Sequence, residues 1–347
     1  MPEIPFVDTS EAIPLTILLS LAPPDGTTRY VDQVTAAAPP QVSFRFFSWR
    51  EALFGRYDAF HVHWPEFLIR DGHPARRMAR LALFRLLLAR LRLRGAALVR
   101  TLHNLHPHEP GDAFEQRSLE RCDRHTDLFI RLNAATPLEG KTGVTILHGH
   151  YRGRYRGVEG LAFEPGRILY FGLIKPYKGV ERLLEVFRGM SDADLRLRVV
   201  GKPSGSLREL VEGQCRDDPR ITARLEFVPD DVLAQEVCGA ELVVLPYREM
   251  HNSGAILVAL SLDRPVLVPR SPSNAMLAAE VGPGWINMFE GELTSDILRD
   301  CLARVRDTPR AARPRLEGRD WSVVGDLHYK AYRTAIALRR QEAACPA

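Results

Sequence analysis

The chain has 347 residues, 45% hydrophobic and 26% charged, which is typical of a water-soluble globular protein long enough for two domains. Its formal net charge of +4 is too small to indicate nucleic acid as a partner. Its five cysteines are scattered without a CxxC pair, which disfavours a disulfide framework, a zinc knuckle or an oxidising compartment. We expect no signal peptide and no membrane-spanning helix, because the start is acidic and broken by prolines and no long uncharged apolar run follows.

Short apolar runs alternate with helical patterns along the chain, which predicts two doubly wound, Rossmann-like α/β domains. The predicted strands of the first half are residues 15–22, 59–64, 96–103, 127–133 and 144–149, with a helix at 74–94. Those of the second half are residues 168–172, 195–201, 224–228, 241–246 and 264–269, with helices at 179–190, 206–216, 231–239 and 253–262. We expect an acceptor-binding domain at 1–160, a nucleotide-sugar domain at 161–320, and terminal helices at 321–347 that pack back toward the first domain.

The loop "FGLIKPYKG" follows the first strand of the second half and opens a helix. Gly172 permits a tight turn and Gly179 a close backbone approach, and Tyr177 lies between the cations Lys175 and Lys178. Helix N-termini favour anions, so this loop predicts a diphosphate site. The alternative is a solvated lysine pair in an ordinary loop.

A second loop repeats this logic after the strand that ends at Pro246. Asn252 and Ser253 are N-cap residue types, and Gly254 lets a ligand approach the start of an apolar, buried helix. The alternative is a capped core helix without a ligand.

These two loops, with the "RPV" that follows the helix, resemble the nucleotide-sugar half of GT-B glycosyltransferases, in which two Rossmann-like domains face each other across a cleft. The resemblance implies that Lys178 contacts the diphosphate. It also implies that two loops border the nucleobase, one carrying Gly201 and Lys202 and the other Phe227 and Val228.

The chain departs from the common retaining members of that fold. Leu173 stands where they carry arginine, and Met250 and Val258 stand where they carry two glutamates. These departures leave room for an inverting enzyme.

Longer motifs extend the resemblance from about Pro14 to Tyr332: "RFFSWREALFGRYDAFHVHWPEFLIR", "VRTLHNLHPHE", "TILHGHYR", "FGLIKPYKGVE" and "MHNSGAILVALSLDRPVL". Together they resemble the mannosyltransferases of xanthan-type exopolysaccharide assembly. The resemblance implies inverting transfer from GDP-mannose to a polyprenyl-diphosphate-linked oligosaccharide that ends in glucuronate. It implies no cofactor and no required metal, and we read Asp192–Asp194 as an exposed turn.

An inverting transfer needs one base to take the acceptor's proton, and we expect it after a strand of the first domain. Glu109 is the favoured candidate, and His103, Glu66 and Asp25 are alternatives, with His148 or His150 also in range. His61 and His63 flank Val62 in a strand. We expect them to point to opposite sides, with at least one a structural histidine.

Glucuronate carries a carboxylate, so we expect arginine in the acceptor site. In "HYRGRY", His150, Tyr151, Arg152 and Arg154 are candidates, and Asp25 with Arg29 and Tyr30 is a second option. The alternative for the first segment is a solvent-exposed stretch that leads into the linker at 156–167.

Eight arginines and no acidic residue lie between Gly72 and His108. A helix with this composition can lie on an anionic membrane, here the inner face of the plasma membrane, and its candidate contacts are Arg76, Arg77, Arg80, Arg85 and Arg90. The alternative is a domain helix whose arginine stems cover the core.

Three rival functions stay open at this point. One is a GT-B transferase with a UDP-sugar or a different acceptor. The second is a metal-dependent hydrolase with His103, His106 and His108 as ligands and Glu109 as base. The third is a sugar- or membrane-binding protein without activity.

Overall fold

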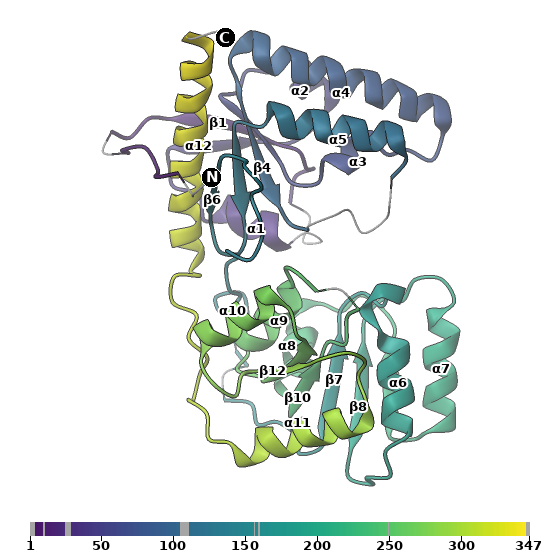
Figure 1. The fold of residues 1–347 in the computed structure, drawn as a ribbon. Helices are drawn as coiled ribbons and strands as arrows, with labels where there is room; N and C mark the ends of the chain where they lie inside the picture. Colours follow the sequence, from purple (N-terminus) through teal and green to yellow (C-terminus); the bar gives the residue numbers. More distant parts are fainter. Residues whose placement is uncertain are drawn as a thin grey trace. The chain divides into compact units, whose positions relative to one another are not determined.

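The computed structural model describes residues 4–9, 11–24, 29–104, 111–155, 157–158, 160–248 and 250–344. Two compact units make up the chain (Figure 1): the first combines Met1–Gly149 with Gly318–Ala347, and the second is His150–Glu317. The second unit therefore begins at His150 rather than at residue 161, so the "HYRGRY" segment belongs to it. None of the helices among the described residues is long and apolar enough to cross a bilayer.

Each unit is built on a parallel sheet of six strands within the described residues. The first has the order β2-β1-β3-β4-β5-β6 and the second β12-β11-β10-β7-β8-β9. The first sheet contains β1 Leu15–Leu19, β2 Val42–Arg45, β3 Ala59–Val62, β4 Ala97–Leu102, β5 Leu128–Arg131 and β6 Gly143–Thr145. The second contains β7 Arg167–Phe171, β8 Arg196–Val200, β9 Ile221–Arg224, β10 Leu242–Val244, β11 Val266–Pro269 and β12 Ile286–Phe289.

Helices fill most of the connections between the parallel strands, and the connection from β5 to β6 contains only turns. The first unit carries α1 Arg29–Ala36, α2 Trp49–Phe54, α3 Pro65–Ile69, α4 Pro74–Arg94, α5 Ala113–His125 and α12 Trp321–Ala344. The second carries the 3-10 turn Pro176–Lys178, α6 Val180–Arg188, α7 Leu207–Asp217, α8 Asp230–Cys238, α9 Gly254–Ser261, α10 Pro272–Val281 and α11 Ser295–Asp307. The expected strand at 224–228 is wrong, because the strand lies at Ile221–Arg224.

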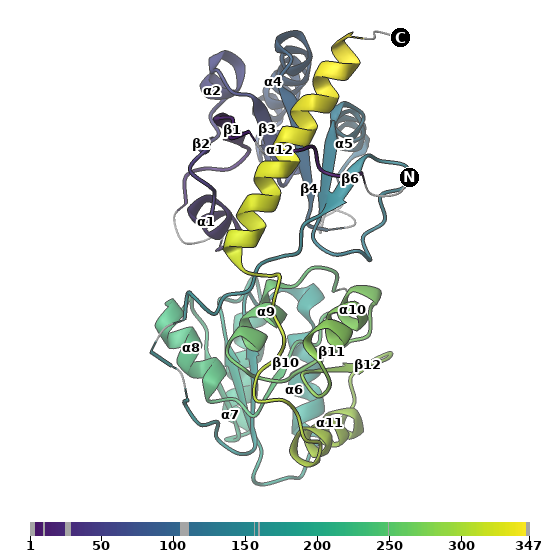
Figure 2. The same ribbon diagram turned by 90° about the vertical axis from the view of Figure 1, so that its left-hand side faces the viewer.

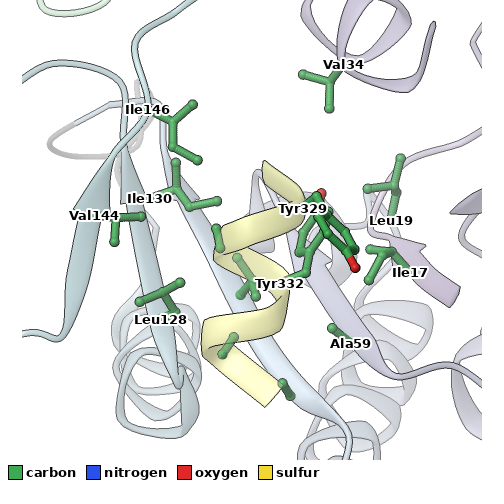
Figure 3. Close-up of a cluster of buried hydrophobic side chains, with 14 of the residues drawn as sticks. Ile17, Leu19, Val34, Ala59, Leu128, Ile130, Val144, Ile146, Tyr329 and Tyr332 are labelled. Carbon is green, nitrogen blue, oxygen red and sulfur yellow. The ribbon is translucent and has the colours of Figure 1, made fainter. Parts of the chain in front are cut away.

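The core of the first unit has two layers, one on each face of its sheet. One face packs against α1 and α12 and includes Ile17, Ile130 and Tyr332. The other packs against the helices α2 to α5, with Phe60 and Phe84 at its centre. Figure 2 shows α12 crossing the face of this sheet, and in Figure 3 its two tyrosines point toward the strands.

The alternation of side chains along β3 decides where the histidines point. Ala59 belongs to the α12 layer, whereas Phe60 and Val62 belong to the opposite layer. His61 and His63 share the face of Ala59, since residues two apart in a strand point the same way. The expectation that they face opposite sides is therefore wrong, and both are buried.

Candidate functional site

The loop after β7 forms the expected turn into α6. Gly172 has a φ of 112° and Gly179 a φ of 67°, conformations that favour glycine. A Cβ added at Gly179 would lie 2.2 Å from the carbonyl oxygen of Pro246, the residue two positions beyond β10. Gly179 therefore lets the loops after two neighbouring strands touch.

Lys178 is held by the aromatic residue that follows β10. Its ammonium Nζ donates to the Tyr247 hydroxyl at 3.1 Å and lies 4.7 Å from the centre of that ring. Tyr177 packs edge-on against Tyr247, with ring centroids 6.3 Å apart. Burial lowers the pKa of Lys178 and raises that of Tyr247. The ammonium is thus a preoriented cation at the carboxyl edge of the sheet.

The start of α9 lies beside this cation. Ser253 is the N-cap residue, as expected, but its side chain makes no capping hydrogen bond. It interacts instead with the Tyr247 side chain, where a hydrogen bond favours the ionised phenol. Because a free helix N-terminus attracts anions, Ser253, Asn252 and Gly254 retain the arrangement of a phosphate site.

The loop after β8 pairs with the loop after β7. The Ile174 amide donates to the Lys202 carbonyl at 3.0 Å, and the Ser204 amide donates to Ile174 at 3.0 Å. A Cβ at Gly201 would lie 1.8 Å from the carbonyl oxygen of Gly172, so the glycine accommodates a neighbouring chain. This pairing brings the segments of Lys175 and Lys202 together.

Two residues after β9 were expected to border the nucleobase, and they differ in exposure. Phe227 is 60% exposed, whereas Val228 is buried. Phe227 is available for stacking against a planar ring, and Val228 belongs to the core.

In the first unit, five histidines gather where β3, β4, the segment after β6, and α12 meet around Tyr30. Its ring lies 5.1 Å from that of His103 and 5.0 Å from that of His148. The His103 ring stacks on Trp64 with centroids 4.2 Å apart. All five histidines are buried or half-buried among these aromatic rings: His61, His63, His103, His148 and His328.

Hydrogen bonds fix the rings of this histidine cluster. His61 contacts the Tyr332 hydroxyl at 2.9 Å and the Thr101 hydroxyl at 2.7 Å. His63 Nδ1 and His103 Nε2 are 3.0 Å apart, so one of them carries the shared proton.

Burial lowers the pKa of every member of the cluster. It lowers the pKa of His63 to about 3 and those of His148 and His328 to about 4. The pKa values of His61 and His103 are lowered well below 6.5 by the same cause. A base with a strongly lowered pKa accepts a proton poorly at neutral pH, so His103 is better suited to positioning.

Glu66 lies away from this cluster. It is buried at the start of α3, where burial raises its pKa while the nearby Arg100 and Arg70 oppose the rise. Arg70 forms an ion pair with Glu115 of α5 at 2.7 Å. Glu66 is therefore part of the packing between helices on the face opposite the histidines.

The acceptor role expected for "HYRGRY" does not fit its contacts. Arg152 pairs with Asp263 at 3.1 Å, and Arg154 pairs with Asp230. Tyr151 is buried and cannot stack on a sugar, and His150 accepts a hydrogen bond from the Arg152 amide at 3.3 Å. These side chains stabilise the second unit.

Tyr30, of the second acceptor option, is also buried, in the histidine cluster of the first unit, and the Arg29 side chain lies outside the described residues.

Several predicted residues lie outside the described residues: Asp25, His106, His108 and Glu109. Among the described residues, no three His, Cys, Asp or Glu side chains gather in a way that could hold a metal ion.

A family model described as "Glycosyl transferases group 1" matches residues 165–287. GDP-mannose:glycolipid 4-beta-D-mannosyltransferase from Xanthomonas campestris pv. campestris is 48% identical over 335 residues, which cover 96% of each chain. The chain belongs to this glycosyltransferase family.

Solved structures extend this similarity at the level of the fold. Sucrose-phosphate synthase from Thermosynechococcus elongatus superimposes with a TM-score of 0.61 at 15% identity, covering 95% of this chain and 99% of that one. The α,α-trehalose-phosphate synthase from Burkholderia vietnamiensis has a TM-score of 0.61 at 14% identity, covering 94% and 98%. This chain thus has the GT-B fold, and the predicted fold class is confirmed.

The sequence patterns did not predict the residues that orient Lys178 and the histidine cluster. Tyr247 holds Lys178, and Thr101, His328 and Tyr332 surround the histidine cluster. A tyrosine directly after the strand that ends in proline was the available signal for Tyr247. For Tyr332 and His328 there was none, because α12 reaches the site only through the tertiary fold.

Proposed function

We propose that this glycosyltransferase moves mannose from GDP-mannose, with inversion, to a polyprenyl-diphosphate-linked oligosaccharide ending in glucuronate, within exopolysaccharide assembly. The observation that carries the proposal is the 48% identity to the Xanthomonas enzyme along 96% of both chains. The loops around Lys178 and Ser253 agree with it, because they present a cation and a helix N-terminus where a diphosphate leaving group requires them.

The chemistry needs one proton transfer and one displacement. The acceptor hydroxyl oxygen forms a bond to the anomeric carbon as the bond to the diphosphate breaks, and GDP leaves with both electrons of that bond. Lys178 and the amides of α9 stabilise the charge on the leaving group. Glu109 remains the proposed base, since burial lowers the pKa of His103 well below 6.5 and makes it a weak proton acceptor, and Glu66 lies on the other face of the sheet.

Turnover of GDP-mannose against a panel of lipid-linked acceptors tests the substrate assignment, and calorimetry with GDP and UDP tests the nucleotide. We expect product only with the glucuronate-terminated lipid, tighter binding of GDP, and a β linkage by NMR. An α linkage would overturn the inverting mechanism.

Replacement of Glu109 by glutamine tests the base. The amide cannot accept the proton, so we expect a loss of turnover of roughly 10²–10⁴-fold with GDP binding unchanged. Retained turnover would reassign the base to His103, Glu66 or Asp25.

We also propose peripheral binding of the first unit to an anionic inner-membrane surface through α4. Not every side chain of α4 is available for this contact, because Leu81, Leu87, Leu88 and Leu91 are buried in the core. Arg77 pairs with Asp112 at 2.6 Å, and Arg80 pairs with Asp71 at 3.0 Å. Arg90 donates to the Tyr57 hydroxyl at 2.6 Å. These arginines belong to the fold.

A different stripe of α4 faces solvent and supports the membrane proposal. Met78, Leu86 and Leu93 are 60%, 56% and 86% exposed, and the side chains of Arg76 and Arg85 are exposed beside them. Exposed phenylalanines lie on the other helices that cover the same face of the sheet: Phe54 on α2, Phe67 on α3 and Phe114 on α5. Exposed apolar side chains bordered by arginine are the composition of a surface that docks on anionic lipid.

A further inference from the structure

A cavity of about 830 Å³ lies at the amino edge of the second sheet. Its walls come from the segment before β7, the residues just before β10, β11 and β12, and the last turn of α11 with the chain after it up to residue 313. The loops assigned to the donor follow the carboxyl ends of β7, β8 and β10. Because all strands of the sheet are parallel, the cavity and the donor loops lie at opposite edges.

The cavity wall is strongly basic. Five arginines and two carboxylates line it, which leaves a net charge of +3 for Arg152, Arg264, Arg306, Arg310 and Arg313 against Glu241 and Asp263. The carboxylates are already engaged: Glu241 accepts two hydrogen bonds from Arg306, and Asp263 contacts both Arg152 and Arg313.

Two of these guanidiniums hydrogen-bond only to backbone carbonyl oxygens among the described residues. Arg264 donates to Cys238, Asp263 and Leu161, and Arg310 donates to Val305. Burial lowers the pKa of both groups, which reflects charge held in a poorly solvated wall. Both arginines are half-buried, and a positive charge in such a partly desolvated wall is stabilised by an anion.

Two further donors have no acceptor among the described residues. The indole Nε1 of Trp285 and the Nε of Arg152 are both buried without a hydrogen-bond partner, and both residues line the cavity. Trp285 is 2% exposed, and the Arg310 guanidinium lies 5.4 Å from its ring centre. A buried donor left unpaired costs about 1–3 kcal/mol, so these groups favour an acceptor oxygen supplied by a ligand.

We propose that this cavity binds an organic diphosphate, in a site separate from the donor loops. A diphosphate group balances a net charge near +3, whereas a single carboxylate leaves most of it unbalanced. Its oxygens accept from Trp285 and Arg152, and the guanidiniums of Arg310 and Arg313 neutralise it. The volume exceeds that of the anion alone, and Phe163 and Tyr155 provide apolar wall for the organic part. The proposal does not depend on the transferase function.

Inorganic pyrophosphate is the probe for the test, applied to the full chain. The indole N–H resonances of a ¹⁵N-labelled sample report binding at Trp285 directly, and Trp285→Phe assigns its signal. We expect that resonance to shift saturably with pyrophosphate, both in the wild type and in Lys178→Gln. An unchanged Trp285 signal, or a shift lost in Lys178→Gln, overturns the proposal.

Calorimetry in the Lys178→Gln background supplies the second arm. We expect Arg310→Gln with Arg313→Gln to weaken pyrophosphate binding at least about tenfold, the effect of losing charge-assisted hydrogen bonds. The matched control removes two arginines of α11 that do not line the cavity, Arg299→Gln with Arg304→Gln, and should change affinity less than about twofold. Equal weakening by both pairs would mean nonspecific charge attraction and would overturn the site.

Discussion

Lys178 illustrates how a single residue is prepared for a charged ligand. Its position in the loop after β7 was predicted from the sequence, but its orientation depends on Tyr247, which lies 69 residues later in the chain, after another strand. The parallel pairing of β7 with β10 brings the two together. The sequence contains no local signal for that pairing.

Substitutions at this pair separate charge from orientation. We expect Lys178→Gln to weaken GDP binding by roughly 10–100-fold, because it removes the cation. Tyr247→Phe keeps the cation and the ring but frees the ammonium, so its effect should be several-fold smaller. Calorimetry with GDP measures both, and equal losses would contradict the orienting role of the hydroxyl.

Gly179 carries a second residue-scale prediction. Gly179→Ala combines a φ of 67° with a Cβ 2.2 Å from a carbonyl oxygen, and should lower the free energy of unfolding by at least about 2 kcal/mol. Gly205→Ala is the matched control, because Gly205 also has a positive φ, 56°, but nothing lies within 4 Å of its added Cβ. Urea unfolding of both variants checks the prediction. Equal losses would mean that the close approach to Pro246 contributes nothing.

At the scale of elements, α4 shows where sequence patterns succeed and where they fail. Its bounds were predicted correctly, and it ends at Gly95 in the left-handed conformation that commonly terminates helices. Its faces were not predicted, because leucine and arginine occur at nearly all angles and only packing against the sheet decides which leucines are buried. The edge strands β2 and β12 were missed for a related reason, since both are short and only half-buried.

The exposed stripe of α4 predicts a specific loss of membrane binding. Leu86→Gln with Leu93→Gln should reduce flotation with vesicles that contain anionic phospholipid by roughly tenfold, because two apolar side chains no longer enter the interface. Leu210→Gln, at an exposed leucine of α7, is the control and should have no effect. Equally weak binding of the wild type to neutral and anionic vesicles would refute the membrane proposal.

At the scale of the whole molecule, the histidine cluster makes stability depend on pH. Buried histidines with lowered pKa values bind protons less well in the folded protein than in the unfolded chain, where their pKa is about 6.5. Their contribution to the free energy of unfolding is therefore complete above about pH 6.5. It is lost as the pH falls toward 4 and 3, by up to about 1.4 kcal/mol per pH unit for each group. Asp127 opposes this in part, because burial raises its pKa to about 6.

We therefore expect the melting temperature to fall steeply between pH 7 and pH 5. His148→Gln removes one titrating group and should flatten the slope, even if it lowers stability at pH 7. Calorimetric scans of both proteins over this range provide the measurement. A wild-type melting temperature that is constant from pH 7 to 5 would show that these histidines do not stay neutral.

The two-domain organisation could be predicted from the βα alternation, and so could the donor loops, because each follows a strand and opens a helix. The histidine cluster could not be assembled in this way. His61 lies on β3, His103 directly follows β4, and His328 and Tyr332 are contributed by a helix that follows the entire second unit. Contacts of such long sequence separation leave no periodic signal in a single sequence.

The return of α12 to the first unit also has a consequence for synthesis on the ribosome. The sheet of residues 15–145 emerges early, but Tyr329, Ala331 and Tyr332, which cover one of its faces, are translated only after the second unit. The part of that apolar face on which α12 packs therefore stays uncovered while the second unit is made and can fold, and α1 covers another part. A transcript truncated shortly before α12 would yield a chain whose second unit is intact but whose first unit exposes its core, a form suited to recognition by chaperones and proteases.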